Sequence, residues 1–226
     1  MIKCVVFDFD GVLVDSNAVK RGAYFDIFPS LGGTHPAVEA VLGRNRDGDR
    51  YEIIGAILRR LIDRGLLRLK NSTITDLTRV YAEQYNSICE EFAATCREMP
   101  GVSPSLPELS RRYVLYVNSA TPEEPLLRII RRRGWEGYFR GVRGRPRTKT
   151  ENLVRISESE GVTNSETVFV GDSQGDLEAA AQWGCHFVGL LSDTSAFESE
   201  PNYTIRSLSD LQEIIDYLDR KLVRGE

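Results

Sequence analysis

Four aspartates are the residues of this sequence best suited to chemistry. Each ends or follows an apolar, β-branched run that is typical of a buried strand. They are Asp8 and Asp10 at the end of the first run, and Asp172 and Asp176 after a later one. Aspartates in such places commonly form turns or cap helices. Capping accounts for one acid of the second pair, but two acids four residues apart at a helix start face the same side.

A serine and a lysine occupy comparable places. Ser119 ends another apolar run just before an expected helix whose capping box begins at Thr121, and the free amides of a helix start bind anions. Asn118 is the alternative candidate for that place. Lys149 falls in the first turn of a helix, where a cation opposes the helix dipole. A simple N-cap and a solvated lysine are the ordinary interpretations, and the dipole argument favours another role for Lys149.

The elements that must position these residues alternate along the chain. Apolar runs predict strands at 2–9, 113–117, 167–170 and 186–190, and helices are expected at 121–134, 148–161 and 174–183. This alternation predicts an α/β fold, a doubly wound, Rossmann-like parallel sheet. Ligands of such sheets bind at the carboxyl ends of the strands. We therefore expect the aspartates, the serine and the lysine to converge at one edge.

One long segment interrupts this alternation. Residues 17–97 show helical spacing and no convincing strand. They predict a helical cap domain inserted into a core that comprises residues 1–16 and 98–226. Prolines and glycine within residues 100–107 predict a hinge where the chain returns to the core. The cap is the one large segment expected to close over the strand ends.

Converging carboxylates require a cation. Two like charges 4 Å apart repel by about 4 kcal/mol at an effective dielectric constant of 20. Oxygen ligands together with a phosphorylated substrate suit Mg²⁺, which binds through one or two carboxylates, water and phosphate. The sequence therefore predicts a magnesium site.

Composition excludes several other functions. The net charge of −4 disfavours nucleic acid as a partner, and no apolar run approaches the roughly 18 residues of a membrane span. Two histidines are too few for a histidine-rich zinc site. No cysteine has an arginine six residues later, which excludes a cysteine-dependent phosphatase. Scattered cysteines and the lack of a secretory signal predict a cytoplasmic protein, and the oligomeric state stays open.

In their order along the chain, these motifs resemble the haloacid dehalogenase-like hydrolase superfamily, in particular its phosphoglycolate phosphatase-like branch with a helical cap. The resemblance covers nearly the whole chain. It is carried by Asp8-Phe9-Asp10-Gly11-Val12-Leu13-Val14-Asp15-Ser16, Ser119-Ala120-Thr121-Pro122, Lys149, and Gly171-Asp172 through Asp176. The helical insert lies where that family carries its cap.

The resemblance implies a role for each matched residue. Asp8 would be the nucleophile that forms a phosphoaspartyl intermediate, and Asp10 the general acid and base. The other implied roles are phosphate binding by Ser119, Ala120 and Lys149, and Mg²⁺ binding by Asp8, the Asp10 carbonyl, Asp172 and Asp176. A carboxylate at position 10 also separates the chain from the dehalogenases, whose halide leaving group needs no proton.

These residues predict a Mg²⁺-dependent phosphatase of a small phosphorylated metabolite. Two alternatives stay open, a sugar phosphomutase with the same motifs and a catalytically silent member that binds a ligand or partner. Cap residues Lys20, Arg44 and Arg46 are candidates for contacting the substrate, although solvated charges explain the two arginines equally simply. The eight arginines of residues 128–147 are interpreted as a solvated helix face and loop.

Overall fold

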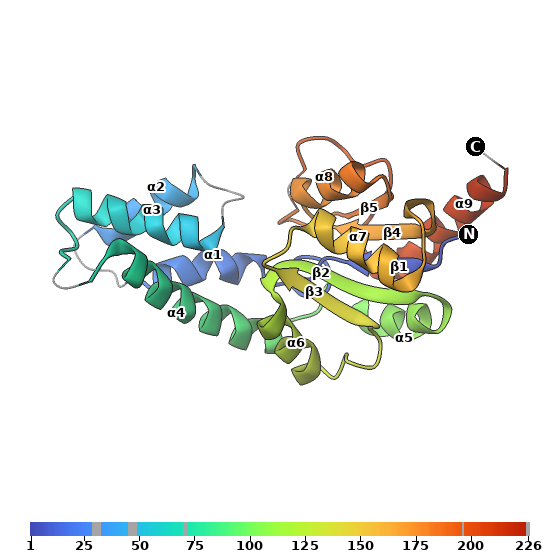
Figure 1. The fold of residues 1–226 in the computed structure, drawn as a ribbon, viewed down its shortest axis with the longest axis horizontal. Coiled ribbons are helices and arrows are strands. Elements are labelled where there is room, and N and C mark those ends of the chain that lie inside the picture. Colours follow the sequence, from blue (N-terminus) through green and yellow to red (C-terminus); the bar gives the residue numbers. More distant parts are fainter. Residues whose placement is uncertain (29–32, 45–48, 70–71, 196, 225–226) are drawn as a thin grey trace. The chain divides into compact units, whose positions relative to one another are not determined.

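The computed structural model describes residues 1–28, 33–44, 49–69, 72–195 and 197–224. The chain divides into two compact units (Figure 1). Unit 1 comprises Met1–Asn17 and Ala93–Glu226, and unit 2 comprises Ala18–Phe92. Unit 1 contains the parallel sheet, and unit 2 is the helical insert.

Unit 1 is built on a six-stranded, all-parallel sheet with the order β3-β2-β1-β4-β5-β6. The strands are β1 (Cys4–Phe7), β2 (Val114–Pro122), β3 (Gly141–Arg145), β4 (Thr167–Gly171), β5 (His186–Leu190) and β6 (Thr204–Ile205). The first strand of the chain lies in the middle, and the order reverses there, so the sheet is doubly wound as predicted.

Helices cover both faces of this sheet (Figure 1). They are α5 (Val102–Arg112), α6 (Glu123–Arg132), α7 (Lys149–Glu160), α8 (Gln174–Trp183) and α9 (Leu211–Arg224). Alternation along β1 shows how the faces divide, because successive side chains of a strand point to opposite sides. Val5 and Phe7 pack in one cluster with α5, α6 and α9, whereas Cys4 and Val6 pack in another with α7 and α8.

Two elements of unit 1 differ from the sequence prediction. The segment after residue 100 is the helix α5 rather than a hinge, although Pro107 lies inside it. The apolar side chains Val102, Leu106 and Leu109 recur at helical spacing and are buried, and this burial outweighs the hydrogen bond that the proline removes. The arginine-rich stretch contains the edge strand β3, in which only Val142 and Gly144 are buried.

Unit 2 consists of helices in its described residues, with no strand among them. These are α1 (Asn17–Asp26), α2 (Thr34–Leu42), α3 (Arg50–Asp63) and α4 (Ile74–Thr95). They enclose their own apolar cluster, in which Ile54, Ile57 and Leu58 of α3 are completely buried.

The end of α4 belongs to unit 1 rather than to the cap to which the sequence assigned it. Ala93 and Ala94 are buried in the apolar cluster of the sheet. The following residues are tied to the chain that leaves β1, since the Asp15 amide donates to the Arg97 carbonyl at 2.9 Å and the Arg97 side chain pairs with the Asp15 carboxylate at 2.9 Å. The second boundary between the units therefore falls at 92/93 rather than 97/98, and the first at 17/18 rather than 16/17.

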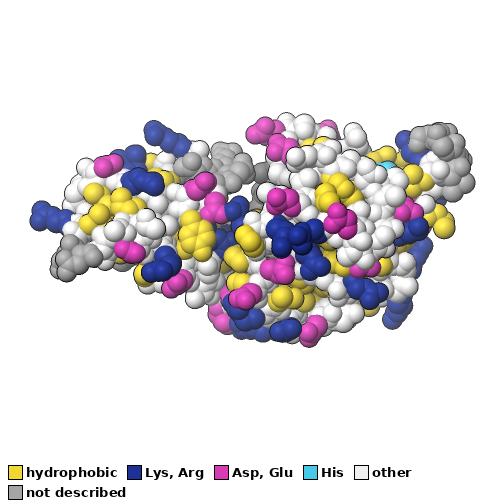
Figure 2. Space-filling view, in the orientation of Figure 1, with side chains coloured by type: hydrophobic (Ala, Val, Ile, Leu, Met, Phe, Trp, Pro, Cys, Tyr) yellow, Lys and Arg dark blue, Asp and Glu magenta, His cyan; other side chains and the backbone are white. Residues whose placement is uncertain are grey.

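The surface mixes charges of both signs. On the face shown in Figure 2, basic and acidic side chains are interspersed over both units, and hydrophobic side chains lie among them. No helix in the described part of the chain has the length and apolarity needed to cross a membrane.

Candidate active site

The register of the three central strands brings the predicted residues to one edge. Phe7 of β1 lies opposite Val117 of β2 and Val170 of β4. The residues that follow these three along the chain, among them Asp8 and Ser119, therefore lie at the same edge of the sheet. This is the carboxyl edge, where doubly wound folds bind ligands.

Three carboxylates meet at this edge. Asp8, Asp172 and Asp176 each present an oxygen within 4.8 Å of the others, and all three are buried. Burial raises the pKa of Asp172 well above its usual range, and the negative charges of Asp8 and Asp176 add to this effect. Burial also raises the pKa of Asp8, against the opposing attraction of Lys149. The site is thus an electrostatically costly cluster of acids.

Two glycines make room for this cluster. Gly11 has a φ of +80°, and a Cβ atom there would come within 2.0 Å of Asp172 Oδ2. At Gly171 a Cβ atom would come within 2.3 Å of the Asp176 Cβ atom. Positive φ and close approach are the two conditions that favour glycine. The glycines next to both aspartate pairs therefore serve the close packing of the acids.

Lys149 supplies the positive charge inside the cluster. Its Nζ atom hydrogen-bonds to Asp176 Oδ1 and lies 3.1 Å from Asp8 Oδ1. Burial alone would lower the pKa of Lys149, but the carboxylates of Asp176 and Asp8 raise it above its usual range. The lysine is the first residue of α7, behind a capping box of Thr148 and Glu151 as predicted. It therefore stays protonated between the two acids.

Two hydroxyl groups contact the carboxylate of Asp10. Ser16 Oγ donates to Asp10 Oδ1 at 2.5 Å, and Thr121 Oγ1 donates to Asp10 Oδ2 at 3.2 Å. All three residues are buried. The carboxylate of Asp10 thus has a donor on each oxygen, and its orientation is fixed from both sides.

The turn after β2 corrects a sequence prediction. The strand continues to Pro122, and α6 begins at Glu123 with Pro122 as its N-cap and no side-chain cap. The Thr121 hydroxyl, which the sequence predicts as the start of a capping box, donates to Asp10. Ser119 Oγ instead accepts a hydrogen bond from the Thr121 amide at 3.1 Å, while Ala120 is exposed.

Three residues proposed for substrate contact lie in the helical insert. Lys20 is a half-buried residue of α1, and Arg44 is exposed two residues after the end of α2. Arg46 lies outside the described residues. Both described residues belong to unit 2, and their contact with substrate stays a prediction.

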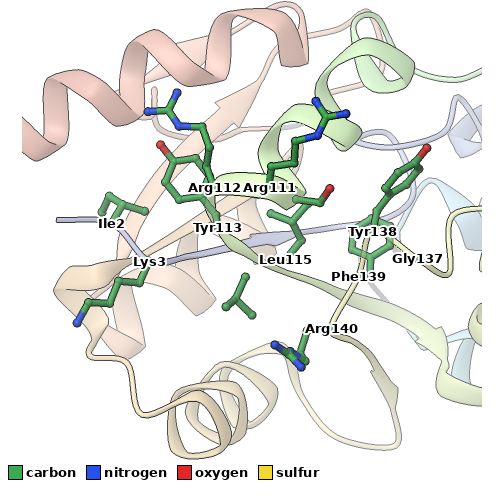
Figure 3. A pocket seen from close by; sticks show the side chains of 12 residues that line it. Ile2, Lys3, Arg111, Arg112, Tyr113, Leu115, Gly137, Tyr138, Phe139 and Arg140 are labelled. Atoms are coloured by element: carbon green, nitrogen blue, oxygen red, sulfur yellow. The ribbon is translucent and has the colours of Figure 1, made fainter.

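A hollow of about 570 Å³ lies at the opposite, amino edge of the sheet, where β1 and β2 begin (Figure 3). It is lined by Lys3, Arg111, Arg112 and Arg140 among others, and none of the described residues that line it is acidic. Most of these charges have partners outside it, since Lys3 pairs with Glu166, Arg112 with Asp216 and Arg140 with Glu160. Arg111 and Arg112 also lie in the last turn of α5, where cations are favourable.

Comparison with known proteins accounts for the acidic edge. The model of the haloacid dehalogenase-like hydrolase family matches residues 2–184. The chain belongs to this family. Phosphoglycolate phosphatase from Vibrio parahaemolyticus is 28% identical over 95% of this chain and 96% of its own. The enzyme of the same name from Pseudomonas putida is 27% identical over 83% of this chain and 69% of its own.

Solved structures of haloacid dehalogenase-like proteins share the fold. A protein described as a predicted phosphoglycolate phosphatase from Haemophilus somnus has a TM-score of 0.71 at 21% identity, covering 95% of this chain and 98% of its own. A β-phosphoglucomutase from Clostridium difficile has a TM-score of 0.72 at 15% identity, covering 99% and 100%. The family and its curated relatives confirm the predicted enzyme class, a phosphatase-type hydrolase.

Proposed function

We propose that the chain is a Mg²⁺-dependent phosphatase that hydrolyses a small phosphorylated metabolite through a phosphoaspartyl intermediate on Asp8. The observation that carries this proposal is the cluster of Asp8, Asp172 and Asp176 around Lys149 at the carboxyl edge of the sheet. A buried carboxylate beside a fixed cation is suited to attack phosphorus while the cation holds the phosphate oxygens.

The residues present fit a divalent cation. All the donors are carboxylate or carbonyl oxygens, which suit Mg²⁺. Asp8 Oδ1 is buried and accepts no hydrogen bond of good geometry from the described residues. Burial raises the pKa values of Asp8 and Asp172, and a bound cation would stabilise their charged forms. Asp8, the Asp10 carbonyl and Asp172 would bind the ion, with Asp176 supporting it or its waters.

The protein's own groups divide the reaction between them. Asp8 attacks phosphorus and becomes the phosphoaspartate, while Asp10 gives a proton to the leaving alkoxide and later takes one from the attacking water. Lys149, Ser119 Oγ and the Ala120 amide hold the phosphate oxygens. A bound Mg²⁺ supplies charge neutralisation on the phosphoryl group.

We expect phosphate release from a panel of phosphorylated metabolites to require Mg²⁺, to stop with chelator and to return when the metal is restored. Asp172→Ala should raise the Mg²⁺ concentration for half-maximal rate by at least about 10-fold or abolish activity, since ligand loss costs metal affinity. Asp210→Ala, at an exposed aspartate of the turn Leu208–Asp210, is the matched control. It should change neither the activity nor the Mg²⁺ concentration for half-maximal rate. Full activity in chelator would overturn the metal site. Isomerisation of a sugar phosphate without phosphate release would instead support a phosphomutase. A lack of turnover with every substrate would support a catalytically silent member of the family.

The metal-free protein should lose thermal stability as the pH rises from about 4 to 7. Burial raises the pKa of Asp8 from 3.8 to about 7, so its contribution to stability is complete below pH 4 and is lost as the pH passes the folded-state value. Each kcal/mol lost is worth roughly 2–4 °C in Tm for a chain of this size. Thermal unfolding with chelator, with saturating Mg²⁺ and in Asp8→Asn measures the effect. Both Mg²⁺ and the substitution should flatten the decline, and equal pH slopes in all three would contradict the assignment.

A further inference from the structure

A pair of buried amides connects β2 to the helix that carries Lys149. Asn118 of β2 and Asn152 of α7 have no exposed surface. Asn118 Nδ2 donates to the Lys149 carbonyl at 2.9 Å, and Asn152 Nδ2 donates to Asn118 Oδ1 at 3.0 Å. The Asn118 side chain thus hydrogen-bonds to two residues in the first turn of α7, and Asn152 Nδ2 also donates to the Gly144 carbonyl of β3 at 3.5 Å.

The direction of these bonds is determined by their partners. A carbonyl can only accept, so Asn118 must turn its Nδ2 towards Lys149 and its Oδ1 towards Asn152. Asn152 must then present its own Nδ2, which leaves Asn152 Oδ1 buried without a hydrogen-bond partner among the described residues. An unpaired buried acceptor lowers stability. Stability alone therefore does not explain a polar pair at this place.

Helix capping does not explain the pair either. The groups left unpaired at the start of a helix are N–H groups, whereas its first carbonyls accept bonds from the next turn. At α7 the capping box of Thr148 and Glu151 already serves the amino end. The bond from Asn118 to the Lys149 carbonyl is therefore an additional tether of the helix to the sheet.

We propose that the Asn118–Asn152 pair positions Lys149 against the nucleophile Asp8. The inference rests on the proposed function, in which Lys149 binds the transferred phosphoryl group. Lysine has a flexible side chain, and Nζ must lie between Asp176 and Asp8 at the same time. Holding the backbone of residue 149 restricts where that side chain begins. A misplacement of about 1 Å costs about 10²-fold in rate.

The test combines rates, ligand binding and stability. Asn152→Leu keeps the branching of the side chain at Cγ, removes its donor and changes no group that is proposed to bind phosphate. It should lower single-turnover phosphorylation of Asp8 by about 10- to 100-fold. It should also weaken the affinity for inorganic phosphate, measured calorimetrically with Mg²⁺ present. In a Lys149→Ala background the same substitution should weaken phosphate binding no further. If Asn152→Leu fails to fold, Asn152→Ser, which is too short to reach Asn118, replaces it.

Ile156→Ala is the matched control. Ile156 is buried on α7 in the cluster between the helix and the sheet, and it is one turn beyond Asn152. Its truncation should lower Tm at least as much as Asn152→Leu while leaving phosphate affinity within about 2-fold. The positioning role is overturned if the loss of activity parallels the loss of Tm in both variants. It is also overturned if Asn152→Leu weakens phosphate binding by the same factor with and without Lys149. If Lys149→Ala itself leaves turnover and phosphate binding unchanged, the role of the lysine in the proposed function has failed, and the inference fails with it.

Discussion

Replacing Asp8 by asparagine should lower steady-state phosphate release by about 10⁴-fold or more, because an amide cannot form the phosphoenzyme and loss of a covalent nucleophile is among the costliest changes in an enzyme. The variant should fold. Asp8 is a buried acid whose pKa is raised by burial, and by Asp176 and Asp10, against the attraction of Lys149, so a neutral isostere removes a net cost of burying the charge. We therefore expect the Tm of the metal-free variant to equal or exceed that of the parent protein at pH 7.

The measurement pairs phosphate release with acid-quenched trapping of radiolabelled phosphoenzyme. Asp15→Asn is the matched control, since it makes the same change in the same segment at a partly exposed pair with Arg97. It should retain both the label and the rate. Substantial turnover by a well-folded Asp8→Asn protein, shown by mass spectrometry to be free of deamidated Asp8, would exclude Asp8 as the nucleophile.

Central strands and their ends could be predicted from sequence because burial on both faces produces uninterrupted apolar runs. Cys4–Phe7 and Thr167–Gly171 are such runs, and the acids that follow them converge because parallel register places strand ends together. The edge strand β3 lacks this signal. It presents arginines alternately with Val142 and Gly144, and a strand with one buried valine is indistinguishable in sequence from a charged loop.

The sequence indicates the candidate catalytic residues more clearly than the residues that orient them. Thr121 satisfies the pattern of a helix cap, and only the path of β2 shows that its hydroxyl donates to Asp10. Ser16 lies within the first motif, and its contact with Asp10 gives it a role that the motif alone does not indicate. In the sequence Asn118 is only a competitor of Ser119, and nothing in the sequence indicates a role for Asn152. Except for the contact between Ser16 and Asp10, these contacts join segments distant in sequence, and spacing along the chain contains no information about them.

Replacing Asp10 by asparagine should produce a loss that depends on the leaving group. General acid–base catalysis is typically worth about 10²–10⁴-fold. An alkyl phosphate needs a proton on its leaving oxygen, whereas nitrophenolate leaves without one. Phosphorylation of Asp8 by an alkyl phosphate should therefore slow by that factor, while phosphorylation by nitrophenyl phosphate should change by less than about 10-fold. The carbonyl oxygen of asparagine can still accept from Ser16, and its amide can donate to the Thr121 hydroxyl, so the side chain should keep its orientation.

The two steps must be separated for this comparison to be decisive. In the second step Asp10 is proposed to activate water, so steady-state rates of both substrates should fall together once dephosphorylation is limiting. Single-turnover phosphorylation isolates the first step. Thr121→Val offers a second variant, because it removes one donor from the Asp10 carboxylate and leaves the acid itself in place. It should show the same preference for nitrophenyl phosphate to a smaller degree, since a loosely held acid still transfers its proton at a reduced rate. Equal losses for both substrates in Asp10→Asn would mean that residue 10 acts on the phosphoryl group or the metal rather than on the leaving oxygen.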